Sequence, residues 1–239
     1  MKIDNTIALV TGANRGIGLA FTKALLARGA RKVYAAARDP ASVPALPGVE
    51  AIRLDVTKPD QVAAAVARAG DVNLLVNNAG VGQFGGFLAA DSEEVARQML
   101  EVNFFGMLRM SKAFAPVLAA NGGGESGGAL LNVLSIVSWI NGGELAGYAA
   151  SKSAAWSLTN ALRHELAAQR TQVLGLHMAF VDTDLVRAVD GPKTSPELIV
   201  ARALDGLEAG LDEVLADERT QLTKLGLVAA RPSYLPQAA

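Results

Sequence analysis

Hydrophobic residues occur in two kinds of segment along this chain, one short and one longer. Short apolar runs predict buried β-strands, and the longer stretches between them, rich in alanine and leucine, predict α-helices. Strands are expected at residues 6–10, 32–36, 50–54, 71–76, 129–134, 172–177 and, as a last strand, 212–216. The helices that follow them are expected to end near residues 28, 69, 120, 168 and 211. Thr57 is expected to cap the second of these helices, Asp91 to start the third and Ser195 to cap the last.

Strands that alternate with helices over short links predict an α/β protein, with a parallel sheet covered by helices on both faces. Right-handed crossovers then give a doubly wound sheet, which binds its ligands at the carboxyl ends of the strands. No linker, internal repeat or break in composition divides the chain, so residues 1–239 are expected to form a single domain.

The composition narrows the classes of function. The chain is 51% hydrophobic and 19% charged with a net charge of −1, so nothing suggests nucleic acid or a membrane surface as a partner. The absence of cysteine fits a reducing compartment and removes disulfides and thiolate metal sites. His164 and His177 are too few for a histidine-rich metal centre, and neither is given a catalytic role. The first residues lack the apolar core of a signal peptide and no apolar run reaches the length of a membrane span, so a cytoplasmic protein is expected.

A glycine-rich turn, T-G-A-N-R-G-I-G at residues 11–18, follows the first strand and leads into a helix. Strand, glycine turn and helix form the setting in which such a motif binds a dinucleotide, because the backbone can approach a pyrophosphate at the helix N-terminus. The spacing G-x-x-x-G-x-G differs from the usual G-x-G-x-x-G, and glycines that serve packing alone are the alternative. The position after the first strand favours ligand binding.

The end of the second strand carries Arg38, and Arg15 lies in the glycine turn. In dinucleotide folds an acid at this edge binds a ribose 2′-hydroxyl, whereas arginine suits a 2′-phosphate. Asp39 leaves an alternative open, because a second strand one residue longer would put this acid at the edge in place of Arg38. The alternative for both arginines is that they are ordinary surface charges.

Tyr148 and Lys152 are four residues apart in G-Y-A-A-S-K, a spacing that places both side chains on one face of a helix. A phenol ionises near pH 10, and a fixed ammonium beside it lowers that pKa toward the working range. The pair is therefore a candidate proton donor for a developing alkoxide. An interfacial tyrosine with a solvated lysine is the plain alternative.

The marked positions all follow strands and should meet at one edge of the sheet, namely Gly12, Arg38, Asp55, Asn78, Ser135 and Thr183. With T-G-A-N-R-G-I-G at 11–18, D-V at 55–56, N-N-A-G at 77–80, Asn103, Ser135 and Y-A-A-S-K at 148–152, the sequence resembles the short-chain dehydrogenase/reductase family over essentially its whole length. The resemblance implies a single-domain Rossmann-type fold, a nicotinamide cofactor, and the interconversion of carbonyl and alcohol.

The resemblance also implies roles for matching residues. Tyr148 would be the general acid in reduction and the base in oxidation, and Lys152 would lower its pKa and bind the nicotinamide ribose. Ser135 would hold the substrate oxygen where negative charge develops. Asn103 would anchor a water that connects Lys152 to solvent.

Cofactor contacts are implied along the same edge. The pyrophosphate would be held by the glycine turn, namely Gly12, Asn14, Arg15, Gly16, Ile17 and Gly18, and the 2′-phosphate by Arg38. Asp55 and Val56 would bind the adenine, and Asn78, Ala79 and Gly80 would line the adenosine side. Val181 and Thr183 would line the nicotinamide side, where Tyr148 and Lys152 would also contact the ribose. One departure stands out, because Met178-Ala179 replaces the Pro-Gly pair of many family members.

The leading hypothesis is an NADPH-dependent carbonyl reductase that acts on a small or medium, fairly apolar ketone or aldehyde, with NADP(H) preferred over NAD(H). A non-catalytic dinucleotide sensor or scaffold on the same fold is the alternative, although Ser135, Tyr148 and Lys152 are all present. A methyltransferase is disfavoured by the Tyr-x-x-x-Lys motif. No metal is expected, and alanine-rich helix faces around residues 91–120 and 147–168 suggest a homo-oligomer, a dimer or tetramer. The substrate, its stereochemistry and the physiological direction are left open by the sequence.

Overall fold

The computed structural model describes residues 1–122, 127–187 and 189–236. Its centre is one parallel sheet in the order β3-β2-β1-β4-β5-β6-β7. The strands are β1 Ile7–Thr11, β2 Lys32–Ala37, β3 Val49–Arg53, β4 Leu74–Asn77, β5 Ala129–Val133, β6 Gln172–His177 and β7 Glu213–Leu215. The helices are α1 Gly16–Ala27, α2 Pro59–Arg68, α3 Ser92–Leu100, α4 Met107–Asn121, α5 Ala146–Glu165, α6 Pro196–Glu208 and α7 Glu218–Gly226.

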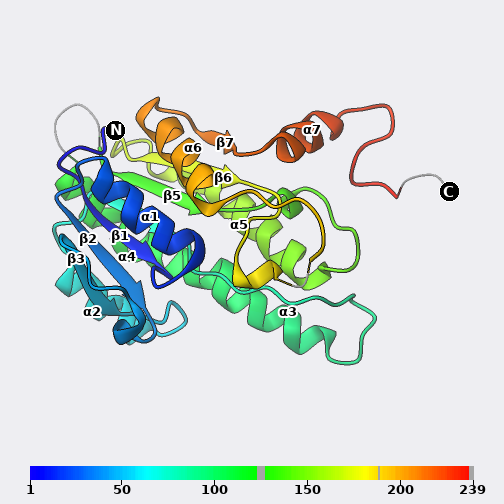
Figure 1. The fold of residues 1–239 in the computed structure, drawn as a ribbon, viewed down its shortest axis with the longest axis horizontal. Coiled ribbons are helices and arrows are strands. Elements are labelled where there is room, and N and C mark those ends of the chain that lie inside the picture. The colour runs from blue at the N-terminus through cyan, green and yellow to red at the C-terminus, as the bar shows by residue number, and fades with distance from the viewer. Residues whose placement is uncertain (123–126, 188, 237–239) are drawn as a thin grey trace.

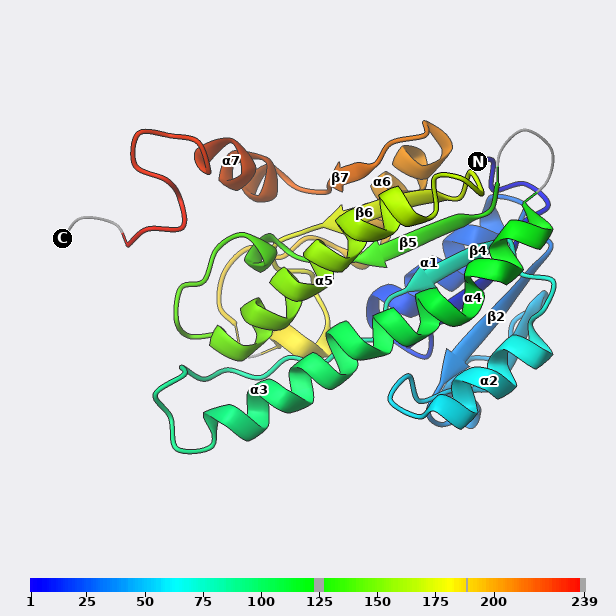
Figure 2. The same ribbon diagram turned by 180° about the vertical axis from the view of Figure 1, so that it is seen from behind.

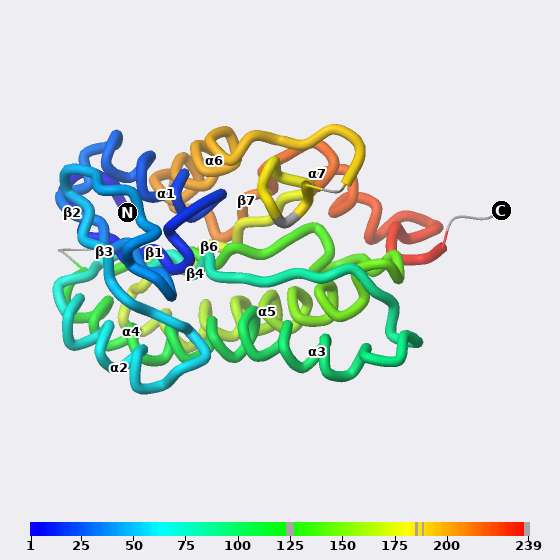
Figure 3. The backbone as a smooth tube through the Cα atoms, turned by 60° about the horizontal axis from the view of Figure 1, so that its bottom comes forward, coloured from blue at the N-terminus to red at the C-terminus, as the bar shows by residue number. Residues whose placement is uncertain are grey.

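Helices cover both faces of the sheet. Figure 1 looks onto the face that carries α1 and α6, and Figure 2 shows α2, α4 and α5 across the opposite face. The tube view separates the three layers, with the strands between the two sets of helices (Figure 3). The expected doubly wound α/β fold is confirmed.

The sequence pattern explains the two layers of core. In β1, Ala8 and Val10 join a core cluster with Phe21 and Leu25 of α1, because alternate side chains of a strand point to opposite faces. Ile7 and Leu9 join the other cluster, under α2, α4 and α5. A strand buried on both faces must be apolar throughout, which is why continuous apolar runs mark the central strands of this chain.

Several element boundaries differ from expectation and helix α7 was not expected; two of the differences bear on the carboxyl edge of the sheet. Strand β2 runs to Ala37, one residue further than the sequence pattern predicts. Helix α2 begins at Pro59 after Lys58, rather than after a Thr57 cap. The reason is that the hydroxyl and backbone N–H of Thr57 both donate to Asp55 Oδ1, at 2.8 and 3.0 Å.

The predicted long helix over residues 91–120 is interrupted. Residues Glu101–Gly106 form a π-helical segment between α3 and α4, with Asn103 buried inside it. Figure 2 shows the three segments following one another as a single rod. At Gly106 an added Cβ would lie 2.6 Å from Val56 Cγ2, so this part of the rod packs directly on the loop after β3. A π-helical turn of this kind frequently marks a functional site.

Candidate active site

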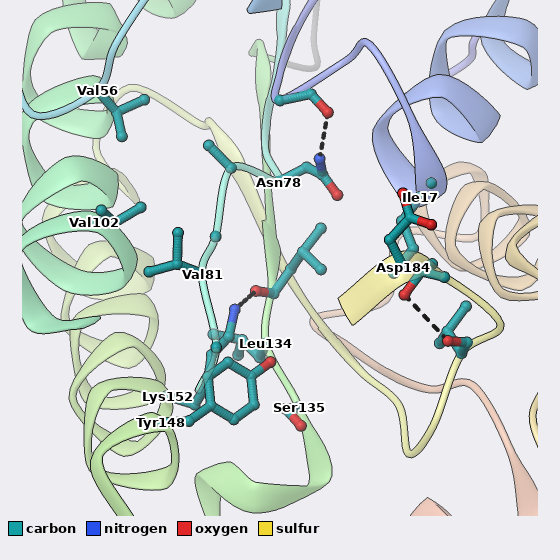
Figure 4. A pocket seen from close by; sticks show the side chains of 18 of the residues that line it. Ile17, Val56, Asn78, Val81, Val102, Leu134, Ser135, Tyr148, Lys152 and Asp184 are labelled. Carbon is teal, nitrogen blue, oxygen red and sulfur yellow. Dashed lines mark hydrogen bonds between the residues drawn. The ribbon is translucent and has the colours of Figure 1, made fainter. Parts of the chain in front are cut away.

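A cavity of about 1510 Å³ opens at the carboxyl ends of the strands. Its lining includes most of the residues that the sequence singles out: Gly12, Asn14, Arg15, Gly16, Ile17, Arg38, Asp55, Val56, Asn78, Ala79, Gly80, Ser135, Tyr148, Lys152, Val181 and Thr183. Gly18 and Asn103 do not line the cavity, but they contact Gly12 and Val81, which do. Figure 4 shows side chains from the glycine turn, the β4 loop, β5 and α5 around this space.

The glycine turn is built for close packing. Gly12 and Gly16 have φ of +65° and +53°, in the left-handed region that glycine adopts without strain. A Cβ at Gly18 would lie 2.1 Å from the carbonyl oxygen of Gly12, so α1 starts directly against the turn. The side-chain amide of Asn78 donates to the carbonyls of Thr11 and Gly12, at 2.8 and 3.2 Å. Asn78 therefore braces the turn from β4, and the N-terminal backbone of α1 faces the cavity.

Arg15 and Arg38 both line the cavity, and both are exposed. Arg38 follows β2, while the carboxylate of Asp39 turns back to accept from the N–H of Ala41 at 3.1 Å. The extra residue in β2 thus does not free Asp39, because its oxygen caps the short helical turn Pro40–Ser42. Arg15 donates to Asp184 Oδ2 at 2.8 Å across the cavity mouth, in a pair that is mostly exposed.

The carboxylate of Asp55 lies behind Arg38. Burial alone would raise the pKa of Asp55, but hydrogen bonds from the backbone and hydroxyl of Thr57 and the charges of Arg38 and Lys58 hold it below its ordinary value. Asp55 is therefore a fixed anion whose charge is compensated locally. Its neighbour Val56 is buried and packs on Gly106.

Tyr148, Ser135 and Lys152 meet at the inner end of the cavity (Figure 4). Burial raises the pKa of Tyr148 to about 12, and the adjacent Ser135 hydroxyl acts in the opposite direction. The Ser135 Oγ accepts from the N–H of Val137 at 3.3 Å and lies 3.5 Å from the carbonyl oxygen of Met178. Two hydroxyls thus face one small space in which a substrate oxygen could be held.

Lys152 is almost fully buried and donates from Nζ to the carbonyl of Val133 at 2.8 Å. Burial lowers its own pKa to about 8. Its Nζ lies 5.7 Å from the centroid of the Tyr148 ring. The effect of Lys152 on the pKa of Tyr148 stays a prediction, since in this structure the ammonium donates to Val133 and desolvation of the phenol dominates.

Asn103 ties the β4 loop to α5. Its Oδ1 accepts from the N–H of Val81 at 2.9 Å, and its Nδ2 donates to the Val81 carbonyl at 2.9 Å and to Ser151 Oγ at 2.8 Å. A Cβ added at Gly80 would lie 3.3 Å from Asn103 Oδ1 and 3.9 Å from Lys152 Nζ, so both side chains lie against Gly80. The arrangement fixes the wall beside Lys152.

The loop after β6 forms the cavity wall next to the glycine turn. Thr183 packs near Gly16, where an added Cβ would be 3.3 Å from its methyl group, and its hydroxyl donates to the Val181 carbonyl at 3.2 Å. In place of a Pro-Gly pair, Met178 accepts from the N–H of Ile136 at 2.9 Å. Ala179 donates its N–H to Asp217 Oδ2 at 2.7 Å, so an acid from the start of α7 holds this turn.

Sequence reasoning missed the residues of the outer, substrate-side wall. Apolar side chains from separate loops line it together with an exposed arginine: Phe84, Ile140, Leu145, Phe180, Val186 and Arg219. The guanidinium of Arg219 lies 5.5 Å over the Phe180 ring. None of these positions carries a local motif, because only the fold brings their loops together.

Among the residues that the structure describes, no group of three or more His, Cys, Asp or Glu side chains could hold a metal ion. No helix in that same portion is both long and apolar enough to cross a membrane.

Known proteins resemble this chain over nearly its full length. A family model described as short chain dehydrogenase matches residues 6–193. The chain is 30% identical to the 3-oxoacyl-(acyl-carrier-protein) reductase FabG of Escherichia coli, over 90% of this chain and 88% of that protein. It is 35% identical to the D-erythrulose reductase of Gallus gallus, over 87% and 84% of the two chains. A short chain dehydrogenase from Burkholderia cenocepacia, solved in complex with NADP, shares 41% identity with a TM-score of 0.92, over 97% of this chain and 96% of that one.

Proposed function

The chain belongs to the short-chain dehydrogenase/reductase family, and on that premise we propose that it reduces a ketone or aldehyde to an alcohol with NADPH. The observation that carries this proposal is the convergence of Tyr148, Ser135 and Lys152 at the inner end of a cavity that also contains the glycine turn. A sensor that only binds the cofactor would not need a phenol and a hydroxyl facing one small space.

The cavity suits a nicotinamide dinucleotide. The first residues of α1 line it without an acidic side chain in the first helical turn, so backbone N–H groups and the helix dipole face a pyrophosphate. Arg15 and Arg38 stand at the outer end, where a 2′-phosphate would need cations. Asp55 and Val56 would bind the adenine, Asn78 to Gly80 the adenosine side, and Thr183 the carboxamide.

The chemistry divides between cofactor and protein. The bound nicotinamide supplies the hydride, and the protein supplies orientation, hydrogen bonds and a proton. Ser135 would donate a hydrogen bond to the carbonyl oxygen, which stabilises the negative charge that develops there. Tyr148 would then transfer its phenolic proton to that oxygen. A phenol with a pKa of about 12 is protonated at neutral pH and is ready to act as the acid.

Lys152 would bind the nicotinamide ribose with the two N–H groups that Val133 does not use. Hydroxyls of the ribose would replace part of the water that burial has removed from the ammonium. We place Asn103 beside this lysine as the anchor of a water that resupplies the proton. The apolar side chains of the outer wall favour a small or medium, fairly apolar carbonyl compound.

The association state and domain organisation belong to the same proposal. We expect one domain over residues 1–239 and a homodimer or homotetramer. Phe105 on the α3–α4 rod is 42% exposed, which supports a contact at this side of the molecule. Sedimentation of a single species near the chain mass of 24.7 kDa at micromolar concentration would contradict an oligomer.

Isotope transfer tests the function directly. NADPH that carries deuterium at the transferable position is incubated with the protein and a panel of ketones and aldehydes, and the alcohols are analysed by mass spectrometry. The proposal expects at least one alcohol to gain one deuterium at the former carbonyl carbon. Tight NADPH binding without deuterium transfer to any member of a broad panel would instead favour a sensor.

A further inference from the structure

His177, the last residue of β6, is completely buried next to the candidate active site. Its ring stacks on Trp139, with centroids 4.1 Å apart and planes at 24°. The Nδ1 atom lies 3.0 Å from the carbonyl oxygen of Ser135. Trp139 directly follows the helical turn Ile136–Ser138, which starts after Ser135, so the ring contacts both ends of this turn.

Charged groups from two further elements stand behind the ring. Glu213 on β7 brings Oε1 to 3.3 Å from His177 Nε2. Lys224 on α7 pairs with the Glu213 carboxylate at 3.1 Å, and its Nζ lies 4.4 Å over the Trp139 ring. Figure 1 shows α7 following β7 beyond the end of the sheet. Glu213 and Lys224 thus form a charged pair behind the ring that joins β7 to α7.

The hydrogen-bond geometry indicates which ring nitrogen of His177 carries the proton. Burial lowers the pKa of His177, against the opposing effect of Glu213, so the ring is neutral at pH 7 and carries one N–H. The carbonyl of Ser135 can only accept, and it lies at good hydrogen-bond distance from Nδ1. Nε2 makes no hydrogen bond, although Glu213 is near. The N–H is therefore on Nδ1 and donates to Ser135.

This bond matters because little else fixes the Ser135 hydroxyl. Its Oγ contacts the main chain at 3.3 and 3.5 Å, which are long hydrogen bonds. The place of the hydroxyl therefore depends on the orientation of the Ser135 backbone. The Ser135 carbonyl accepts from the N–H of Ser138 at 3.1 Å and from His177, and the N–H of Ile136 on the same peptide donates to Met178 at 2.9 Å. The ring therefore supplies one of three bonds that hold this peptide.

We propose that His177 is a positioning residue that holds the Ser135 peptide and thereby keeps the Ser135 hydroxyl beside Tyr148. The inference rests on the proposed role of Ser135 in binding the substrate oxygen. His177 acts through Ser135 and touches neither cofactor nor substrate.

Three substitutions separate this role from simple core packing. In H177N the amide nitrogen takes the place of Nδ1 and can still donate to Ser135, whereas in H177Q it takes the place of Nε2. In H177F the ring can still stack on Trp139 but has no donor. We expect kcat of H177N to stay within about threefold of wild type, and kcat of H177Q and H177F to fall by roughly tenfold. This is less than the 10²–10³-fold loss typical when an oxyanion donor is removed outright.

The dissociation constant for NADPH should stay unchanged in all three variants, because His177 does not line the cavity. If His177 only fills space, H177F should be the most active and most heat-stable of the three. An order of kcat in which H177F equals or exceeds H177N would overturn the proposal.

A spectrum of the wild-type protein tests the bond without any turnover. The chain has only two histidines, and His164 is exposed, so an H164Q variant assigns the imidazole ¹⁵N signals of His177. The proposal expects the proton on Nδ1 at pH 7, in slow exchange with water. A proton on Nε2 would overturn it. A wild-type protein that reduces no carbonyl compound would contradict the proposed function, and this spectrum would still decide whether His177 holds Ser135.

Discussion

Replacing the buried Lys152 with methionine should stabilise the cofactor-free protein. Burial lowers the pKa of Lys152 from 10.5 to about 8, so holding the ammonium in the fold costs free energy at neutral pH. The shift of roughly 2.5 units corresponds to about 3 kcal/mol, at 1.36 kcal/mol per unit. Methionine removes this cost with a similar shape, but it leaves the Val133 carbonyl without its donor, which costs about 1 kcal/mol. The net gain is about 2 kcal/mol.

The gain should depend on pH in a defined window. Below pH 8 both the folded and the unfolded wild type carry the proton, so the full cost is present. Between pH 8 and 10.5 the unfolded chain binds more protons than the folded one, so the wild type gains stability as the pH rises. The advantage of Lys152→Met should therefore be largest at pH 7 and nearly absent at pH 10.

Urea unfolding of the two cofactor-free proteins at both pH values measures this difference, and a melting temperature raised by roughly 4–8 °C at pH 7 should accompany it. Lys112→Met, at an exposed lysine of α4, is the matched control and should change the free energy of unfolding little at either pH. A Lys152→Met protein that is less stable than wild type at pH 7, or equally more stable at pH 7 and pH 10, would refute the reasoning.

Two further predictions concern the cofactor. Arg38→Ala should reduce the ratio of kcat/KM for NADPH to that for NADH by about tenfold, because the free energy of an exposed arginine–phosphate bond falls at the low end of about 1.5–3 kcal/mol. Arg53→Ala, at a residue outside the cavity, is the control. An unchanged ratio in Arg38→Ala would contradict the assignment of Arg38 to the 2′-phosphate. Asp184→Asn should tighten NADPH binding by roughly two- to fivefold with little effect on NADH, because Asp184 competes with a 2′-phosphate for Arg15. Calorimetric titration measures both affinities, and weaker NADPH binding in Asp184→Asn would show that the pair assists the phosphate instead.

Much of the fold is readable from apolar runs, because strands buried on both faces must be apolar throughout. Strand β6 falls at the expected residues, and helix α6 starts after Ser195, which caps it as its sequence suggests. The predicted start of α2 was wrong because the Thr57 hydroxyl donates to Asp55, and helix propensity does not predict that bond. The π-helical segment around Asn103 depends on contacts with Val81 and Ser151 from distant parts of the chain.

The cavity lining contains most of the singled-out residues because motifs after parallel strands gather at one edge. The electrostatics could not be predicted in the same way. The sign of the pKa shift at Tyr148 depends on burial by several loops, and the sequence spacing of Tyr148 and Lys152 carries no information about that. No sequence motif indicates the contacts of His177 either, because its neighbours Ser135, Trp139 and Glu213 come from other parts of the chain.

The central claim is that Tyr148 donates the proton in an NADPH-dependent carbonyl reduction. Its most direct test compares kcat and the dissociation constant for NADPH in wild type and Tyr148→Phe, on a carbonyl substrate that wild type reduces. Removing one hydroxyl should lower kcat by about 10²–10⁴-fold, the usual worth of a general acid, and leave NADPH affinity within about twofold. A Tyr148→Phe enzyme that keeps more than half of the wild-type kcat would contradict the account.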